Sequence, residues 1–164
     1  MSKIGIFYGS STRNTETIAE TLAKELKAET YDVSAASIAE LNACDKLILG
    51  TSTLGIGDLQ DDWDCFLDTL VNADLNGKTI ALFGLGDADG YPDSFVDGMG
   101  ILYDTIKDKG CIIVGETATD GYEYEESKAE VNGKFVGLVL DEDNQSDKTE
   151  ARVQAWVTQI SSVF

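Results

Sequence analysis

Short runs of hydrophobic residues alternate along this chain with segments in which hydrophobic residues recur at helical spacing. The runs at 4–8, 47–49, 79–83 and 111–114 predict strands buried on both faces, because they contain few polar positions. A weaker run at 30–33 alternates polar with apolar residues, as an edge strand does. The pattern therefore predicts five strands.

The segments between these runs have the spacing of amphipathic helices, with hydrophobic residues three or four positions apart. Four helices are marked by Ile18, Leu22 and Leu26; by Trp63, Phe66, Leu67 and Leu70; by Phe95, Met99, Leu102 and Ile106; and by Val153, Trp156, Val157 and Ile160. Asp147 and Glu150 have the spacing of a capping box for the last helix.

Strand–helix alternation predicts an α/β fold in three layers, with a parallel five-stranded sheet covered by helices on both faces. We expect the strand order 2-1-3-4-5 in one domain that spans 1–164. Segment 116–134 interrupts the alternation and ends at Asn132-Gly133, a hairpin-turn signal. Because a further strand-like run follows at 135–140, we interpret this segment as an insertion that splits the last strand.

Charge narrows the classes of partner. The chain of 164 residues has 30 acidic and 12 basic residues, a net charge of −18. Such a surface repels nucleic acid and anionic lipid and attracts basic proteins, although solubility alone is an alternative explanation. The sequence contains no apolar run long enough to span a bilayer and no signal peptide, so we expect a monomeric cytoplasmic protein without membrane insertion.

The residue types that are missing exclude several chemistries. The sequence has no histidine, which excludes Ser–His and Cys–His nucleophile systems and histidine-ligated metals. Its three cysteines, Cys44, Cys65 and Cys111, are far apart in sequence and form no C-x-x-C pair. We therefore expect reduced thiols buried in the core, and no metal site.

The loop after the first strand, Ser10–Thr15, offers hydroxyls, an amide, one guanidinium and the N–H groups of a helix N-terminus. These groups suit a phosphate at the carboxyl edge of a parallel sheet, where ligands of such folds bind. A polar turn that caps the next helix is the alternative. The loop is neither a Walker loop, since G-x-x-x-x-G-K-[ST] is absent, nor a phosphatase loop, since no cysteine precedes Arg13.

Two later loops end predicted strands and suit a flat ring. In the first, Thr53–Asp58, Gly55 permits a peptide flip at the Gly55–Ile56 bond; a flexible loop is the alternative. In the second, Gly86 and Gly90 let the backbone approach a ligand, and Tyr91 can stack on a ring. Tyr91 by itself could equally be a half-exposed aromatic beside a turn. The glycines here match G-x-G-x-x-G poorly, which disfavours a nicotinamide site.

Together these motifs resemble those of the flavodoxin family, of the long-chain type, over essentially the whole chain. The resemblance rests on Ser10–Thr15, on T-L-G-I-G-D-L-Q-D-D-W from Thr53, on G-D-A-D-G-Y-P-D-S-F from Gly86, and on the stretch Thr119–Asp147. It implies a flavodoxin-like fold, non-covalently bound FMN and no catalytic residue, because the protein would be an electron carrier and not an enzyme.

The resemblance also implies roles for particular residues. The phosphate would be held by Ser10, Ser11, Thr12, Asn14 and Thr15, with Arg13 beside it. The ring would be bordered by Thr53, Leu54, Gly55, Ile56, Gly57, Gly86, Asp87 and Tyr91, and the ribityl chain would lie near Asp143. Ser52, Leu85, Ser94 and Phe95 would also bind the cofactor. Two positions depart from the family: Arg13 stands where glycine is usual, and Leu54 stands where many relatives have tryptophan. Because leucine offers less stacking area, we expect weaker flavin binding than in a sandwich of two aromatics, although the ring would still be held. For Arg13 we expect an altered geometry of the phosphate loop or an unusual charge contact.

FMN can hold zero, one or two electrons, and the protein sets the free-energy differences between these redox states. A Gly55 carbonyl turned toward N5 would stabilise the neutral semiquinone, and the net charge of −18 would disfavour the anionic hydroquinone. We therefore expect a low-potential one-electron carrier that shuttles between semiquinone and hydroquinone. Its partners would be basic redox proteins such as a ferredoxin/flavodoxin–NADP reductase, bound in weak, salt-sensitive complexes.

Two alternative functions use related folds. A two-component receiver domain needs a phosphoacceptor aspartate after the third strand and an acidic pair after the first. Here these positions read Gly50-Thr51 and Gly9-Ser10-Ser11. An FMN-dependent NAD(P)H:quinone reductase would need a nicotinamide site and an oligomer interface, and the sequence indicates neither.

Overall fold

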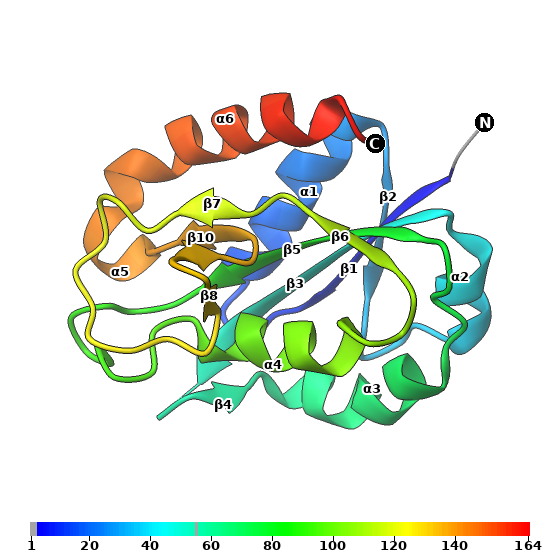
Figure 1. Cartoon of the computed structure of the whole chain (residues 1–164), viewed down its shortest axis with the longest axis horizontal. Helices are drawn as coiled ribbons and strands as arrows, with labels where there is room; N and C mark the ends of the chain where they lie inside the picture. The colour runs from blue at the N-terminus through cyan, green and yellow to red at the C-terminus, as the bar shows by residue number, and fades with distance from the viewer. Residues whose placement is uncertain (1–2, 55) are drawn as a thin grey trace.

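The computed structural model describes residues 3–54 and 56–164. Its main sheet is built from β1 (Ile4–Gly9), β2 (Glu29–Asp32), β3 (Lys46–Leu54), β5 (Thr79–Leu85) and β10 (Leu138–Leu140), in the order β10-β5-β3-β1-β2 (Figure 1). All of these pairings are parallel. The predicted α/β fold with a parallel sheet is confirmed.

The last strand of the sheet is split in two. β6 (Ile112–Val114) pairs with the first half of β5, with Thr79 opposite Ile112, and β10 pairs with its second half, with Leu140 opposite Leu85. Counting both pieces as one strand, the order is 2-1-3-4-5, as the sequence predicts.

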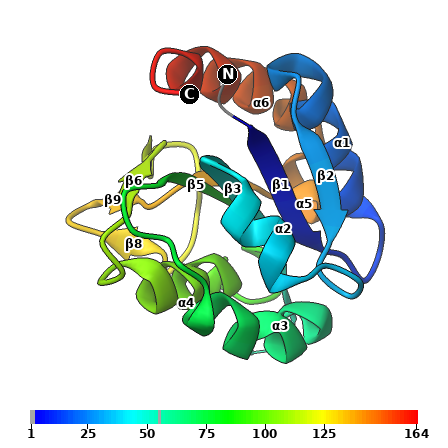
Figure 2. The ribbon, with the colours of Figure 1, turned by 90° about the vertical axis from the view of Figure 1, so that its right-hand side faces the viewer.

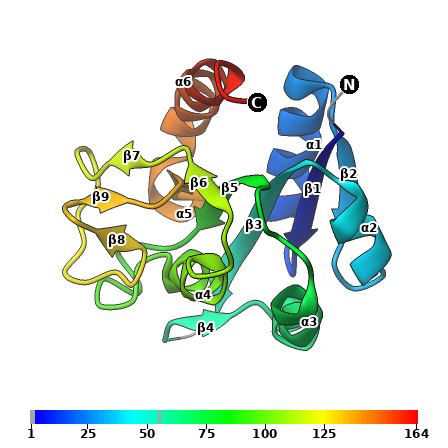
Figure 3. The same cartoon turned by 45° about the vertical axis from the view of Figure 1, so that its right-hand side comes forward.

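The insertion between the two pieces forms its own antiparallel sheet from β7 (Thr117–Ala118), β8 (Glu130–Val131) and β9 (Lys134–Phe135). Asn132 and Gly133 join β8 to β9 with φ angles of 55° and 80°. Positive φ at both central residues is the requirement of a type I′ turn, so the predicted hairpin is confirmed. Figure 3 shows the insertion at the side of the molecule away from β2.

Helices cover both faces of the sheet (Figures 1 and 2). α1 (Asn14–Leu26) and α6 (Thr149–Ser161) pack on one face, and α3 (Asp61–Asn72) and α4 (Asp97–Ile106) on the other. A hydrophobic core lies on each face of the sheet, and alternate strand residues point into one core or the other. Ile48 faces the α1/α6 core, whereas Leu47 and Leu49 face the α3/α4 core. This two-sided burial is why the strands read as continuous hydrophobic runs.

The structure corrects two sequence-based assignments of helix starts. Asp147 does not form a capping box: it lies in a 3-10 turn, η1 (Ser146–Lys148), and the N-cap of α6, Lys148, makes no side-chain capping bond. The capping box belongs instead to α2 (Ile38–Ala43), where the Ser37 and Glu40 side chains bond each other's backbone N–H. Sequence reasoning missed α2 because only Leu41 of this short helix is buried, which leaves no periodic pattern.

Burial at the edges also differs from expectation. Of the three cysteines, all free thiols, Cys44 is buried, Cys111 is half-buried, and Cys65 is exposed on α3. β6 was expected to be buried on both faces, but Ile112 is 57% exposed because the strand lies at the edge of the sheet. Within the described residues, no helix is both long and apolar enough to cross a membrane.

Candidate cofactor-binding site

Four loops meet at the carboxyl edge of the sheet and enclose a pocket of about 220 Å³. They follow β1, β3, β5 and β10, whose parallel directions bring these loops to one edge. The carboxyl-edge pocket is lined by Ser11, Thr12, Asn14, Ser52, Thr53, Leu54, Leu85, Gly86, Asp87, Tyr91, Glu142 and Asp143. All of these except Glu142 were expected from the sequence.

The loop after β1 presents the N-terminus of α1 to this pocket. The N-cap residue, Arg13, makes no side-chain capping bond, whereas Ser10 Oγ accepts a hydrogen bond of 3.3 Å from the Glu16 N–H. Gln60 Nε2 donates to Ser11 Oγ at 3.2 Å, which holds the loop against the start of α3. N–H groups at the start of a helix attract an anion, helped by the helix dipole.

Arg13 does not line the pocket. Its backbone has φ 69° and ψ −5°, in the left-handed region that favours glycine. Its side chain is 87% exposed and lies 3.7 Å from a Glu16 carboxylate oxygen. The other first-loop residues outside the pocket lining are Ser10, which bonds the Glu16 N–H, and Thr15, which is buried beneath the loop.

The loop after β3 folds back through β4 (Asp58–Leu59), which pairs antiparallel with Thr53 and Leu54. Thr53 Oγ1 accepts a hydrogen bond of 2.9 Å from the Gly98 N–H of α4. Ser52 Oγ, by contrast, is buried in the pocket wall and has no hydrogen-bond partner among the described residues. An orphaned hydroxyl of this kind is a position for a polar ligand atom.

Three further residues of this loop, Gly55, Ile56 and Gly57, were expected to border the ring. Ile56 is 83% exposed and does not line the pocket, and Gly57 adopts φ 84° with Ser94 and Asp97 beside it. Gly55 lies outside the described residues, so the peptide flip at Gly55–Ile56 stays a prediction.

The loop after β5 forms a tight turn around Asp87, whose carboxylate accepts a hydrogen bond of 2.8 Å from the Gly90 N–H. Tyr91, at the rim of the pocket, is 43% exposed. A Cβ on Gly86 would lie 2.9 Å from a Val96 methyl, so glycine is needed for this close approach. This loop therefore combines a carboxylate with an aromatic ring that is open to solvent.

Phe95 was expected to bind the cofactor, but it does not line the carboxyl-edge pocket. Its side chain is fully buried and packs against Tyr122, Tyr124 and Phe135 of the insertion and its hairpin. Ser94 is also buried and does not line the pocket. The turn that follows Pro92 directs these two residues into the interior, away from the sheet edge.

The loop after β10 adds carboxylates through α5 (Glu142–Gln145). Burial, with Asp87 and Asp141 nearby, raises the pKa of Asp143. Hydrogen bonds from the Gly90 N–H and from Asn144 lower the pKa of Asp87. Sequence reasoning found Asp143 and missed Glu142, although both directly follow a strand-like run and the rule about strand ends would have found both.

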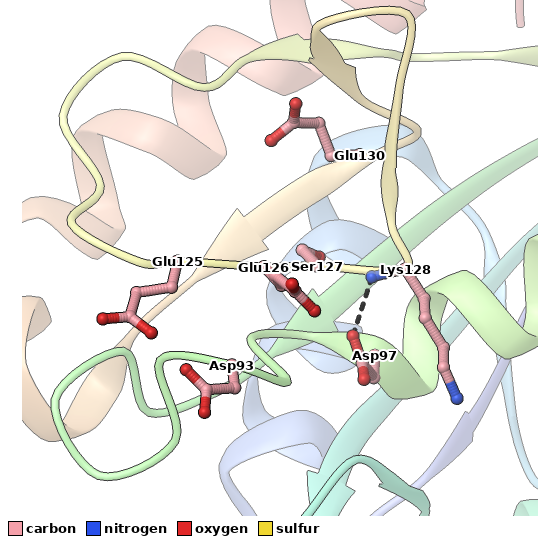
Figure 4. Close-up of a pocket in the computed structure, with 7 residues that line it drawn as sticks. All are labelled: Asp93, Asp97, Glu125, Glu126, Ser127, Lys128 and Glu130. Carbon is pink, nitrogen blue, oxygen red and sulfur yellow. Dashed lines mark hydrogen bonds between the residues drawn. The ribbon is translucent and has the colours of Figure 1, made fainter.

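A second and larger pocket, of about 390 Å³, lies between the start of α4 and the insertion (Figure 4). Its walls are mainly carboxylates, with Asp97 accepting a hydrogen bond of 2.7 Å from the Lys128 N–H. Burial raises the pKa of Asp97, and a hydrogen bond with Asp93 raises that of Glu125. Because most of its lining residues carry carboxylates, which repel an anion, this pocket does not suit an anionic ligand.

The fold and the carboxyl-edge pocket define a doubly wound α/β protein equipped for a ligand with an anionic group and a flat ring. The family model described as Flavodoxin matches residues 6–156. A flavodoxin of Helicobacter pylori is 49% identical over 165 residues, covering 100% of this chain and 99% of its own. One from Synechocystis is 48% identical over 168 residues, with the same coverage.

Solved structures agree with the sequence relatives. The crystal structure of Fusobacterium nucleatum flavodoxin bound to flavin mononucleotide superposes with a TM-score of 0.94 at 39% identity, covering 100% of this chain and 99% of that one. This chain belongs to the flavodoxin family, and it is an electron-transfer protein and not an enzyme.

Proposed function

We propose that the carboxyl-edge pocket holds FMN non-covalently and that the chain, as a monomer of the cytoplasm, is a low-potential one-electron carrier. The observation that carries the proposal is the meeting of three features in one pocket. These are the N-terminus of α1, whose N-cap residue Arg13 makes no side-chain capping bond, the orphaned Ser52 hydroxyl, and the half-exposed ring of Tyr91.

The first loop is the proposed phosphate site. Ser11, Thr12 and Asn14 line the pocket and offer hydroxyl and amide donors beside the first turn of α1. Among the described residues that line the pocket, none is lysine or arginine. Neutral donors and the helix dipole would therefore hold the phosphate, with each hydrogen bond to a charged group contributing about 1.5–3 kcal/mol.

The ring would lie between Tyr91 and Leu54, which line the pocket from the loops after β5 and β3. Gly86 and Asp87 would border its edge, and Ser52 Oγ would gain its missing partner. Because Leu54 is smaller than tryptophan and is not aromatic, the inner face would lack the aromatic term of about 0.5–1.5 kcal/mol.

FMN would supply the one-electron chemistry, and this chain would set the reduction potential of each step. Asp87, Glu142 and Asp143 line the pocket, in a protein whose net charge is −18. Each carboxylate near the ring would disfavour an added electron by about 1–4 kcal/mol, depending on the effective dielectric constant. Such terms support a strongly negative potential for the second electron.

The net charge of −18 also supports the proposal that the partners are basic proteins. Basic oxidoreductases, of the kind that exchange electrons between NADP and a small carrier, would be attracted from a distance and bound weakly. Exposed carboxylates would make these complexes sensitive to salt.

The test is a stepwise reductive titration of the purified chain after it is mixed with FMN and desalted. We expect a yellow protein that takes up two electrons in separate steps, the second at a much lower potential. A colourless protein that gives no heat with FMN in calorimetry would contradict the proposal. Rapid NADPH oxidation with a quinone by the isolated protein would instead indicate a reductase.

A further inference from the structure

One side-chain amide links two of the loops around the carboxyl-edge pocket. Asn144 Nδ2 donates to Asp87 Oδ1 at 2.8 Å, and to Asp141 Oδ1 and Oδ2 at 3.1 and 3.0 Å. Asp87 belongs to the loop after β5, whereas Asp141 and Asn144 follow β10. A single amide thus bridges two carboxylates, one of which, Asp87, is 57 residues away from Asn144 in sequence.

Asn144 is itself held in place from several sides. Its backbone N–H donates to Asp141 Oδ1, which caps the short helix α5. The adjacent Gln145 donates to the Gly121 carbonyl of the insertion at 3.0 Å and accepts a hydrogen bond of 2.7 Å from Arg152. The amide is therefore preorganised, and little side-chain entropy remains to be lost in its contact with Asp87.

The loop after β5 depends on this bridge for its position. Asp141 Oδ2 accepts the Ala88 N–H at 3.2 Å, and Asp87 Oδ1 accepts both the Gly90 N–H and the Asn144 amide. One carboxylate oxygen from each of Asp87, Asp141 and Asp143 lies within 4.8 Å of the other two. Without a donor between them, such like charges would repel one another and move the loop outward.

We propose that Asn144 is a positioning residue for the flavin: it holds Asp87 in place at the rim, and so sets the FMN affinity of the pocket and the potential of the second electron. This inference rests on the proposed function. It adds a residue that does not line the pocket and acts through its hydrogen bonds to Asp87 and Asp141.

The groups that face Asp87 are carboxylates, so loss of the Asn144 hydrogen bond should change the pH dependence of FMN binding. Asp141 and Asp143 face it from the β10 side, and Asp89 lies on its own loop. The bond from Asn144 favours the ionised form of Asp87, so its removal would leave three carboxylates with one donor fewer. The proton affinity of Asp87 would then rise, and FMN binding would become dependent on pH in the acidic range.

The experiment compares Asn144→Leu and Asn144→Asp with Asn72→Leu and Asn72→Asp. Asn72 is exposed at the end of α3, and among the described residues its side chain bonds only the Asp68 carbonyl, so it provides the same changes of shape and charge away from the residues that line the pocket. The measurements are the FMN dissociation constant between pH 4 and 8, the two reduction potentials, and the carboxyl titration of Asp87 by NMR in the whole chain.

We expect both Asn144 variants to weaken FMN binding about tenfold, the size of one net hydrogen bond. Asn144→Leu should also raise the Asp87 titration midpoint, and Asn144→Asp should lower the second potential relative to Asn72→Asp. Folding is followed by near-UV circular dichroism, and Asn144→Gln, which keeps the amide, should recover part of the affinity if it reaches Asp87.

Wild-type affinity, potentials and Asp87 titration in the Asn144 variants would overturn the inference while leaving the proposed function intact. Equal losses in the Asn144 and Asn72 pairs would also overturn it, since they would show a general effect of shape or charge. Failure of the wild-type chain to bind FMN would instead refute the proposed function.

Discussion

Arg13 has a backbone conformation that glycine adopts most readily. Its φ of 69° places a residue with a long side chain in the left-handed region, which costs a residue with a Cβ about 1–2 kcal/mol. Lys27, at the other end of α1, has a similar φ of 56°. The two residues bracket one helix with the same strain and the same charge, but only Arg13 is next to the carboxyl-edge pocket.

This pair gives a prediction at the residue scale. Arg13→Gly should raise the free energy of unfolding by about 0.5–1 kcal/mol, because relief of strain exceeds the added freedom of the unfolded chain. It should also weaken FMN binding at low salt and reduce its salt dependence, because a positive charge beside the phosphate is lost. Urea unfolding and FMN titrations at several salt concentrations measure both effects.

Lys27→Gly is the matched control. We expect the same gain in stability with unchanged FMN affinity. If the two variants have the same FMN affinity and salt slope, Arg13 takes no part in holding the phosphate, and its effect is confined to the backbone.

At the scale of elements, the insertion supports the turn between the pocket and α4. The Glu125 and Glu126 N–H groups both donate to the Pro92 carbonyl, and the Phe95 N–H donates to the Glu126 carbonyl. Asp97, in the first turn of α4, accepts the Lys128 N–H at 2.7 Å. Hydrogen bonds therefore hold the insertion to residues 92–97, the segment that continues the loop after β5.

Asp97 gives this contact a pH dependence. Burial raises its pKa, with Glu126 adding to the effect and Lys128 opposing it. As pH rises past the ordinary carboxyl value, the unfolded chain loses this proton first, so the stability due to Asp97 falls until the folded form also ionises. Asp97→Asn keeps an oxygen for the Lys128 N–H and cannot ionise. The variant should have a free energy of unfolding at least as high as that of the wild type at pH 7, and the difference between the two should decrease toward pH 4.

Urea unfolding of the FMN-free chain across this pH range is the measurement, with Asp104→Asn as control. Asp104 is an exposed aspartate on the same helix, paired with Lys107 at 3.3 Å. A difference between wild type and Asp97→Asn that stays constant from pH 4 to 7 would show that Asp97 does not titrate differently in the folded chain.

At the scale of the whole molecule, the net charge of −18 acts on every charged ligand. It opposes the approach of a doubly charged phosphate and favours that of a basic protein, and salt weakens both effects. Raising the ionic strength should therefore increase the association rate of FMN, by about tenfold over the range in which screening becomes effective, and slow the association of a basic reductase.

Stopped-flow quenching of flavin fluorescence measures the first rate, and riboflavin, which lacks the phosphate, is the control with little expected salt dependence. Salt slopes of the same sign for FMN and for the reductase would show that local charges, and not the net charge, control these encounters.

The strand order, the split of the last strand and the hairpin were predictable from the sequence alone. Each depends on local information: runs of hydrophobic residues, turn residues such as Asn132-Gly133, and the fact that parallel strands end at one edge. Eight of the residues that line the carboxyl-edge pocket followed from this reasoning, because they lie in loops directly after such runs, whereas Ser52, Leu85 and Asp143 were implied by the resemblance to the flavodoxin family.

Tertiary structure alone decided where side chains point and which distant groups meet. The helical pattern that includes Phe95 predicts its burial, but not its partners Tyr122 and Phe135, which the insertion brings against it and which keep it out of the carboxyl-edge pocket. Ile112 belongs to a hydrophobic run and is exposed because nothing pairs with its edge of the sheet within the described residues. The bridge from Asn144 to Asp87 spans 57 residues, and no local pattern encodes a contact that exists only once two strand ends lie side by side.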